Sequence, residues 1–302
     1  SLLSCDWQML MKKNNLRYVT TRGFSHDNLH SMYQIKQTPR VKNHMDLKIQ
    51  GKHAIVCASS RGLGRACVIS LAREGVNVTL NGRDEEALAE ASEACAVFGV
   101  EVQCVQGDIT LGSTRDQLLD ACPTPDILVT NNGGPPPGSI KDWDYNAWIG
   151  ALEANMITHM LMIRAVLDGM VNRKFGRIVN ITSAMVKTPK APMGLSTGAR
   201  AGLTSVSKAL STEVAHANVT INNLLPERIN TGRQKYMAEM QAKREEITVE
   251  EAYERIASTI AAGRLGLPEE FGDACAFLCS AQAGFISGQN LQLDGGSYEG
   301  LI

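Results

Sequence analysis

The 302-residue sequence lacks an excess of charge of either sign, because 30 Lys and Arg stand against 31 Asp and Glu. Proteins that mainly bind nucleic acid usually present a basic face, so this balance argues against that class. The chain also lacks an uninterrupted apolar run of about 18 residues, so no transmembrane helix is expected. No internal repeat of roughly 20–50 residues is found. These absences favour a globular protein without a nucleic-acid or membrane partner.

The eight cysteines include no C-x-x-C pair and follow no secretory apolar segment; they are at positions 5, 57, 67, 95, 104, 122, 275 and 279. Disulfide frameworks belong to oxidising compartments, so these scattered thiols are interpreted as reduced and structural, in a cytoplasmic protein. Cys275 and Cys279 lie one helical turn apart, but two thiols without nearby histidines make a poor zinc site. No metal is therefore expected.

The first 44 residues differ from the rest in charge. They hold seven Lys and Arg and two acids, whereas the remaining residues hold 23 Lys and Arg and 29 acids. A basic segment poor in acids is typical of a targeting peptide, so delivery to an organelle stays an open alternative to a cytoplasmic location. Met45 begins a segment that reads like a natural start. We therefore expect residues 1–44 to be a basic, poorly ordered extension and residues 45–302 to form one domain.

From residue 53 onward, short apolar runs alternate with helical stretches. The expected strands are 53–58, 76–81, 101–106, 126–131, 176–182, 219–225 and 290–294, and long helices are expected near 143–173 and 195–217. Continuous apolar runs that alternate with helices indicate a parallel sheet covered on both faces. The pattern predicts an α/β fold, a doubly wound parallel sheet of the Rossmann type.

Ligands of such sheets bind beyond the carboxyl ends of the strands, so the residues after each strand are candidates. After the first strand comes ASSRGLG, in which Gly62 and Gly64 open the next helix. Glycines there let the backbone approach a pyrophosphate, and a helix N-terminus supplies free N–H groups. Glycine-containing turns are common, however, and Ala58 stands where a first glycine is usual. The turn alone is weak evidence for a phosphate site.

The next strands end in residues that suit the rest of a dinucleotide. The second strand ends at NGRD, where Arg83 lies and no acid occupies the tip, and Arg61 lies in the glycine turn. Two guanidiniums near one point favour the 2′-phosphate of NADP(H), with NAD(H) as the alternative. They could equally be solvated surface arginines. Asp108 follows the third strand and could meet an adenine amino group, and the small residues after the fourth leave room for a flat ring.

Together these segments resemble a short-chain dehydrogenase/reductase from about Met45 to Ile302, closest in pattern to the 3-oxoacyl-acyl-carrier-protein reductases. ASSRGLG is similar to the family's T-G-x-x-x-G-x-G, NNG at 131–133 to its N-A-G, and LLPERINT at 224–231 to its P-G-x-x-x-T. The resemblance implies a set of cofactor-binding residues: Ser60, Arg61, Gly62, Leu63, Gly64, Arg83, Asp108, Ile109, Asn131, Asn132, Gly133, Pro226, Ile229 and Thr231. It also implies a catalytic serine, Ser183 in GRIVNITS, and Asn155 as the asparagine that braces a proton-relay water.

The chain departs from this family at the catalytic pair. Thirteen residues after the serine the family has a tyrosine, followed four later by a lysine, and here Ser196 and Arg200 occupy those positions. A tyrosine near a cation can protonate a developing alkoxide, whereas a serine hydroxyl is a far weaker and shorter acid. Arg200 can still hydrogen-bond ribose hydroxyls, but it stays protonated and cannot relay a proton. The catalytic candidates are thus Ser183, Asn155, Ser196 and Arg200.

Two functions follow from this departure. The first is an NADP(H)-dependent oxidoreductase that reduces a carbonyl substrate of the 3-oxoacyl type, such as an acyl thioester, with an atypical active site. The hydroxyls of Ser183 and Ser196 would bind the oxyanion, and the proton would come from water or Lys187. The second is an NADP(H)-binding protein with little or no dehydrogenase activity, in a sensor or interaction role. Persistence of Ser183, Asn155 and the nucleotide-side pattern favours the first.

The resemblance also implies a substrate lid and an oligomer. The segment 232–262 lies where the family has its lid, and Tyr236, Met237, Met240 and Tyr253 would give it an adaptable apolar inner face. An ordinary pair of amphipathic surface helices explains the same pattern equally well. By resemblance a homotetramer is expected, in which the helices near 143–173 and 195–217 pack against their copies.

Overall fold

Seven parallel strands form one sheet in the computed structural model, which describes residues 45–301. Their order is β3-β2-β1-β4-β5-β6-β7, and their bounds are β1 His53–Val56, β2 Asn77–Gly82, β3 Val102–Gln106, β4 Ile127–Thr130, β5 Gly176–Ile181, β6 Val219–Pro226 and β7 Asn290–Leu293. All seven expected strands are present, with ends shifted by one or two residues. The expectation for residues 1–44 lies outside the described residues.

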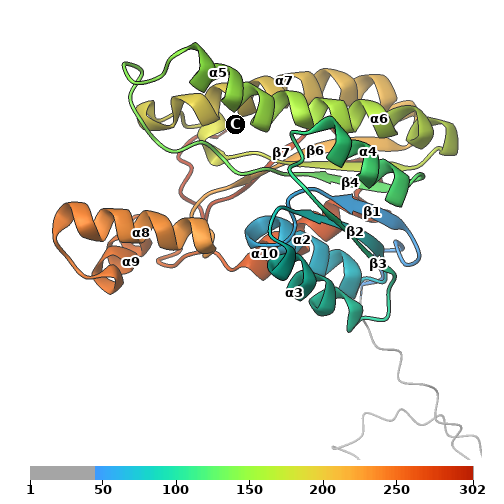
Figure 1. Ribbon diagram of the computed structural model, residues 1–302, viewed down its shortest axis with the longest axis horizontal. Coiled ribbons are helices and arrows are strands. Elements are labelled where there is room, and N and C mark those ends of the chain that lie inside the picture. The colour runs from blue at the N-terminus through green and yellow to red at the C-terminus, as the bar shows by residue number, and fades with distance from the viewer. Residues whose placement is uncertain (1–44, 302) are drawn as a thin grey trace, which may run out of the picture. The chain divides into compact units, whose positions relative to one another are not determined.

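Helices cover both faces of this sheet (Figure 1). The first group is α2 Gly62–Arg73, α3 Glu85–Ala96 and α10 Pro268–Cys279; the second is α4 Gly112–Ala121, α5 Tyr145–Leu152, α6 Thr158–Arg173 and α7 Gly194–Val214. Each group encloses its own core. Leu71 and Phe271 belong to the core on the α2 face, whereas Met162, Ile163 and Ile221 belong to the core on the α6 face. The prediction of a doubly wound α/β fold is confirmed.

The strands lie between these two cores, which explains their sequence. Ile55, Val56, Leu128 and Val129 are fully buried and point alternately to one core and the other. A central strand with both faces covered has no polar side, so its residues read as a continuous apolar run. Each large apolar side chain buried in this way contributes roughly 1.5–3 kcal/mol.

The winding direction of the sheet reverses between β1 and β4. The chain builds β1, β2 and β3 outward on one side, then returns to pair β4 with the free edge of β1. The loops that leave β1 and β4 therefore diverge and open a crevice at the carboxyl edge of the sheet. Such a switch point is where doubly wound folds bind their ligands.

The long helix expected over 143–173 is interrupted. It consists of α5, a π-helical turn at Glu153–Ile157 and α6. Asn155 lies inside the π turn and is almost fully buried against the neighbouring structure. π turns within helices often accompany functional sites because the extra residue redirects a side chain. The sequence pattern did not separate the two helices and predicted one continuous helical region.

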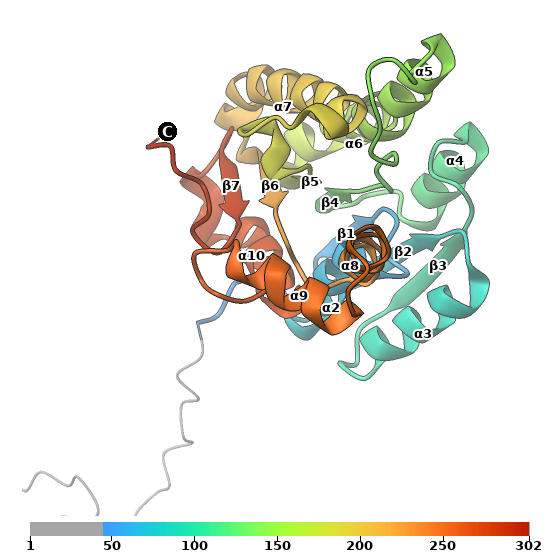
Figure 2. The ribbon, with the colours of Figure 1, turned by 90° about the vertical axis from the view of Figure 1, so that its left-hand side faces the viewer.

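Two further helices, α8 Gly232–Glu245 and α9 Val249–Ser258, follow β6. They form a hairpin with a small core of its own, made by Ala238, Ala242, Ala252 and Ile256. The hairpin projects beyond the edge at which β6 ends, and Figure 2, turned toward that edge, shows it in front of the sheet. Within residues 45–301, none of the helices is both long and apolar enough to span a bilayer.

Candidate functional site

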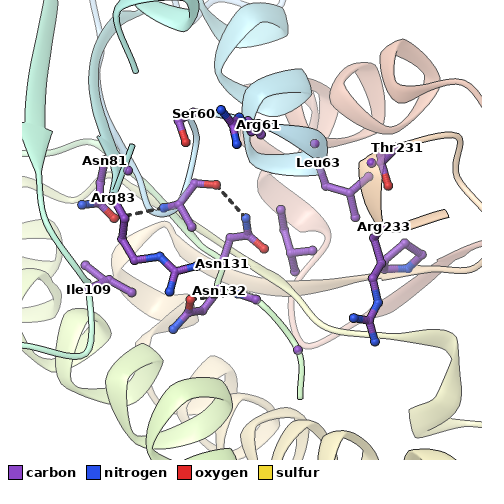
Figure 3. A pocket seen from close by; sticks show the side chains of 18 of the residues that line it. Ser60, Arg61, Leu63, Asn81, Arg83, Ile109, Asn131, Asn132, Thr231 and Arg233 are labelled. Atoms are coloured by element: carbon purple, nitrogen blue, oxygen red, sulfur yellow. Dashed lines mark hydrogen bonds between the residues drawn. The ribbon is translucent and has the colours of Figure 1, made fainter. Parts of the chain in front are cut away.

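A cavity of about 610 Å³ lies at the switch point, and most of the candidate residues line it. The lining includes Ser60, Arg61, Gly62, Leu63, Arg83, Asp108, Ile109, Asn131, Asn132, Gly133, Pro226 and Thr231, together with the catalytic candidates Ser183, Ser196 and Arg200. Figure 3 shows its two ends, with Asn81, Arg83 and Ile109 at one and Thr231 and Arg233 at the other. Cavities of this size accommodate drug-sized ligands.

Three candidates do not line the cavity. Gly64 lies beneath the turn, where a Cβ would come within 2.3 Å of the Ala58 carbonyl oxygen, so it allows helix and turn to pack closely. Asn155 is buried in the π turn. The side chain of Ile229 belongs to the hydrophobic core instead, because its backbone pairs with Gly266 and turns the side chain inward. The prediction that Ile229 binds the cofactor specified no side-chain contact, and it stays a prediction.

The turn after β1 is held open by two asparagines. Asn81 Oδ1 accepts a hydrogen bond from the Ala58 backbone N–H at 3.1 Å, and Asn131 Nδ2 donates to the Ala58 carbonyl at 3.0 Å (Figure 3). These bonds fix Ala58 at a φ of +45°, a left-handed conformation that favours glycine. Alanine thus forms a tight turn for which glycine is usual, and the left-handed backbone of Ala58 is strained.

The turn leads into a helix N-terminus suited to an anion. Residue Arg61 occupies the N-cap of α2 without a side-chain cap hydrogen bond, and the first turn of the helix contains no acid. The first N–H groups of an α-helix have no partner within the helix, and the helix dipole favours negative charge at that end. The residues present therefore fit a pyrophosphate at this point.

Asn81 is a structural residue that the sequence interpretation missed. It is buried, and its Nδ2 donates to the carbonyls of Val105 and Gly107, both at 3.1 Å, while its Oδ1 accepts from Ala58. One side chain therefore joins the ends of β1, β2 and β3. The available signal was an asparagine inside an apolar strand, because a buried polar group needs hydrogen-bond partners.

At the end of the cavity nearest β2, every charged lining residue has a partner of opposite sign. Arg61 pairs with Asp84 at 2.9 Å, and Arg83 approaches Asp108 at 3.8 Å. A hydrogen bond from the Ala87 backbone N–H lowers the pKa of Asp84, and the charge of Arg61 lowers it further. Ion pairs this exposed are worth about 1 kcal/mol or less, so an anion can recruit both guanidiniums. We call Arg61, Arg83, Asp84 and Asp108 the β2 end.

At the opposite end, two arginines and two serines line the cavity. We call Ser183, Ser196, Arg200 and Arg233 the α7 end. Arg200 and Ser196 lie one turn apart on α7, both are buried, and Arg200 Nη1 donates to Ser196 Oγ. Burial lowers the pKa of Arg200 to about 10, with a smaller contribution from the charge of Arg233, so Arg200 is still protonated at neutral pH.

Ser183 lies two residues after the end of β5 and is the N-cap of a short 3₁₀ turn. Its Oγ accepts a hydrogen bond from the Met185 backbone N–H at 3.2 Å. The hydroxyl hydrogen is thereby left available to a ligand in the cavity. Lys187, considered as an alternative proton source, does not line the cavity; its ammonium lies 4.7 Å from the centre of the Tyr298 ring. That alternative finds no geometric support.

Two residues behind the α7 end have buried polar atoms without partners in the described part of the chain. They are Asn155, through Oδ1, and His159, through both ring nitrogens. Burial, and secondarily the charge of Arg200, lowers the pKa of His159 to about 3 and keeps it neutral. His159 lies on α6, four residues after Asn155. The sequence interpretation missed it, although a histidine on the inner face of a helix was a visible signal.

The segment 232–262 contributes less to the cavity than its sequence suggested. Only Gly232 and Arg233 from this segment line the cavity among the residues described. Tyr236 and Met240 are about half exposed, and Tyr253 packs against the small core between α8 and α9. Arg233, which no sequence motif singled out, is therefore the side chain through which α8 reaches the site.

Comparisons with known proteins agree with this geometry. Residues 57–298 match the family model described as enoyl-(acyl carrier protein) reductase. The chain is 30% identical over 253 residues to the 3-oxoacyl-[acyl-carrier-protein] reductase FabG of Vibrio harveyi, covering 83% of this chain and 99% of that protein. It is 29% identical over 260 residues to the NADPH-dependent reductase BacG of Bacillus subtilis, covering 82% and 98%.

A solved structure shows the same arrangement of the chain. The L-sorbose reductase from Gluconobacter frateurii, complexed with NADPH and L-sorbose, superposes with a TM-score of 0.81 at 28% identity, covering 85% of this chain and all of that one. The family match and these relatives extend over nearly the whole sheet and both ends of the cavity. The chain therefore belongs to the short-chain dehydrogenase/reductase family of oxidoreductases.

Proposed function

We propose that this protein is an NADP(H)-dependent oxidoreductase that reduces a carbonyl group, using an active site in which Ser196 and Arg200 replace the family's tyrosine and lysine. The observation that supports this most is one cavity lined by the uncapped turn at Arg61, the guanidinium of Arg83 and the hydroxyl of Ser183. A phosphate site and a potential oxyanion site thus share a single opening. The named activities of the relatives agree with carbonyl reduction.

The β2 end supports NADP(H) rather than NAD(H). Arg61 and Arg83 line the cavity beside the end of β2, where a ribose 2′-phosphate would lie. Their partners, Asp84 and Asp108, leave both guanidiniums largely exposed. Two relatives are described with NADPH, which agrees with this choice. NAD(H) is the weaker alternative, because an NAD(H) site typically has an acid at the tip of the second strand that binds the ribose 2′-hydroxyl. The tip of β2 has no acid and is followed by Arg83.

NADPH, when bound, supplies the hydride, and the residues of this chain manage the charge that develops on the substrate oxygen. The Ser183 hydroxyl donates to that oxygen, because its own acceptor position is occupied by the Met185 N–H. Arg200, which lines the same cavity, stays protonated and adds positive potential at this end. A single preorganised donor of this kind is worth about 2.7–4 kcal/mol. Water supplies the proton, since no tyrosine occupies the site.

The experiment is a steady-state measurement of NADPH oxidation with a panel of ketones, oxo acids and 3-oxoacyl thioesters. Ser183→Ala is expected to lower kcat/KM about 100-fold through loss of one oxyanion donor. Ser205→Ala, an exposed serine on α7, is the matched control and should retain full activity. Equal activity of the wild type and Ser183→Ala would refute the assigned role of Ser183.

A second function has an observation in its favour. Ser196 already accepts a hydrogen bond from Arg200 and is almost fully buried, so the position of the family's proton donor is occupied by a weak acid in a closed arrangement. A protein of this kind could bind NADP(H) and serve in a sensor or interaction role with little turnover. Tight NADPH binding measured by fluorescence, with no oxidation over the whole panel, would support this function over the first.

The exposed apolar side chains of one face support the proposed homotetramer. Tyr145 and Ile149 on α5, Ile157 in the π turn and Val206 on α7 are all exposed. Packing of α5, α6 and α7 against a second copy would remove this apolar surface from water. Light scattering on the eluting protein measures the assembly directly, and a monomeric mass at micromolar concentration would refute the proposal.

A further inference from the structure

The two guanidiniums of the α7 end are held against neighbouring residues of one loop. A Cβ built on Gly134 would lie 3.2 Å from Arg200 Nη1 and 3.4 Å from Nη2, so the guanidinium packs directly on the Gly134 backbone. Arg233 Nη2 donates to the carbonyl of Pro135 at 3.3 Å. Gly134 and Pro135 are adjacent and both line the cavity, as do the two arginines. Arg200 from α7 and Arg233 from α8 therefore converge on the same wall.

These positive charges have no carboxylate opposite them. The only acids among the cavity-lining residues of the described chain are Asp84 and Asp108, and both belong to the β2 end, where they face Arg61 and Arg83. Arg200 is buried, and its Nε has no hydrogen-bond partner within residues 45–301. A buried guanidinium without a counter-charge is costly, and the charge of the exposed Arg233 nearby adds repulsion. The missing negative charge is expected from a ligand.

The cofactor is not the best source of that charge. Its pyrophosphate fits the N-terminus of α2, and a 2′-phosphate fits Arg61 and Arg83, so its phosphates have sites away from Arg200. Ser183 and Ser196 mark the part of the cavity that a substrate carbonyl would enter. An anion between Arg200 and Arg233 is therefore one that the substrate brings. Planar guanidiniums match the geometry of a carboxylate, which two of them can clamp.

We propose that the substrate is an oxo acid, whose carboxylate is bound between Arg200 and Arg233 while its carbonyl oxygen meets the Ser183 hydroxyl. This inference rests on the proposed function and narrows its substrate class from carbonyl compounds in general to those with a carboxylate near the ketone. In the step, the carbonyl π bond breaks, NADPH gives a hydride to carbon and becomes NADP⁺, and water gives a proton to oxygen. The carboxylate is unchanged, and the product is a hydroxy acid.

The location of Arg233 makes the binding selective. Arg233 lies at the start of α8, in the hairpin that projects beyond the sheet, whereas Arg200 is fixed in the wall on α7. A carboxylate bound to both joins the hairpin to the body of the protein. A neutral ester or thioester offers no charge to offset the repulsion between the guanidiniums, so it gains less from the same site.

The test compares levulinate with methyl levulinate, because their ketones lie far enough from the carboxyl group to have similar reactivity. We expect kcat/KM for NADPH oxidation to be at least about tenfold higher with levulinate than with methyl levulinate. Pyruvate and acetoacetate, each compared with its own methyl ester, test shorter distances between ketone and carboxylate. Arg233→Gln should bring the acid-to-ester ratio close to one. Arg233 is exposed, so this variant is expected to fold. Lys235→Gln, an exposed cation on the same helix outside the cavity, should keep the wild-type ratio.

A binding measurement separates this inference from the proposed function. Levulinate is titrated into the protein saturated with NADP⁺, which permits no reduction, and its affinity is followed by calorimetry. Weakening by Arg233→Gln but not by Lys235→Gln supports the carboxylate site even in the absence of turnover with any substrate. Equal kcat/KM values for acids and esters would overturn the inference. The inference would also be overturned if Arg233→Gln weakened the binding of NADPH as strongly as the binding of levulinate, because the guanidinium would then bind the cofactor.

Discussion

The β2 end and the α7 end belong to one cavity but differ in how their charges are balanced. At the β2 end, Arg61 and Arg83 face Asp84 and Asp108 and remain in contact with solvent. At the α7 end, Arg200 is buried, binds Ser196 and faces Arg233 without an acid among the lining residues of the described chain. The β2 end has the features of a nucleotide site in this family, whereas the α7 end has Ser196 and Arg200 at the positions that the sequence resemblance assigns to tyrosine and lysine.

The difference indicates that cofactor binding and chemistry are separable in this fold. The nucleotide site is made largely of backbone groups at strand ends, which the sheet topology positions whatever the neighbouring side chains are. The proposed chemistry depends instead on the side chains of Ser183, after β5, and of Arg200 and Arg233, on α7 and α8, which can be exchanged without disturbing the sheet. The following predictions alter the α7 end, the β2 end, a residue behind the α7 end and the turn that both ends share.

The largest effect is expected from restoring the family pair with Ser196→Tyr and Arg200→Lys together. A positioned general acid typically contributes 10²–10⁴-fold, so we expect kcat for a neutral ketone to rise about 100-fold. NADPH oxidation measures it, with each single substitution as a control. If the double variant folds, binds NADPH normally and keeps the same kcat, then the missing tyrosine and lysine alone do not limit the rate of reduction at the α7 end.

At the β2 end, Arg83→Ala should weaken NADPH binding at least about tenfold and NADH binding less than about twofold, because only NADPH has the 2′-phosphate. Fluorescence titration of each coenzyme measures the two dissociation constants. Arg65→Ala, on α2 outside the cavity, is the matched control and should change neither. Equal losses for the two coenzymes would contradict the 2′-phosphate assignment.

Behind the α7 end, His159 should make the protein sensitive to mild acid. Burial lowers its folded pKa to about 3, whereas the unfolded chain takes up the proton near 6.5. The unfolded state therefore binds more protons between these values, and the free energy of unfolding falls as pH drops, by on the order of 1 kcal/mol at pH 5.5. Above pH 6.5 the effect disappears.

Urea denaturation at pH 7.5 and 5.5 tests this sign. His159→Leu should remove most of the difference between the two pH values, whereas Met162→Ala, a buried and non-titrating change on the same helix, should lower stability equally at both. A loss of stability toward pH 5.5 that is as large in His159→Leu as in the wild type would assign the acid sensitivity to other groups.

The smallest effect is expected at the turn that both ends share. Ala58→Gly should raise the free energy of unfolding by about 0.5–1 kcal/mol, because glycine adopts the left-handed conformation without strain. For a domain of this size the melting temperature should rise by about 2 °C. Ala66→Gly, inside α2, should have the opposite sign. A lower melting temperature for Ala58→Gly would mean that the Ala58 methyl contributes packing that outweighs the strain.

Much of the fold was predictable because the signals are local. The apolar runs at Ile55–Val56 and Leu128–Val129 predict buried parallel strands, and Gly62 marks the start of α2 with its positive φ. The π turn around Asn155 was not predicted, because helical periodicity is judged over a window of about 11–18 residues and the turn spans only Glu153–Ile157. The burial of the Ile229 side chain in the core was not predicted either, because it depends on backbone pairing with Gly266, almost forty residues later.

The sequence by itself determined the sheet, the place of the nucleotide turn and the absence of the tyrosine and lysine, since each follows from residue type and spacing along one segment. Only the tertiary structure decided that Asn81 joins three strand ends, that Lys187 lies away from the cavity, and that Arg200 and Arg233 meet at one wall. The physical reason is that burial and charge pairing depend on side chains from distant segments. A single stretch of sequence records which groups are present but not which of them become neighbours.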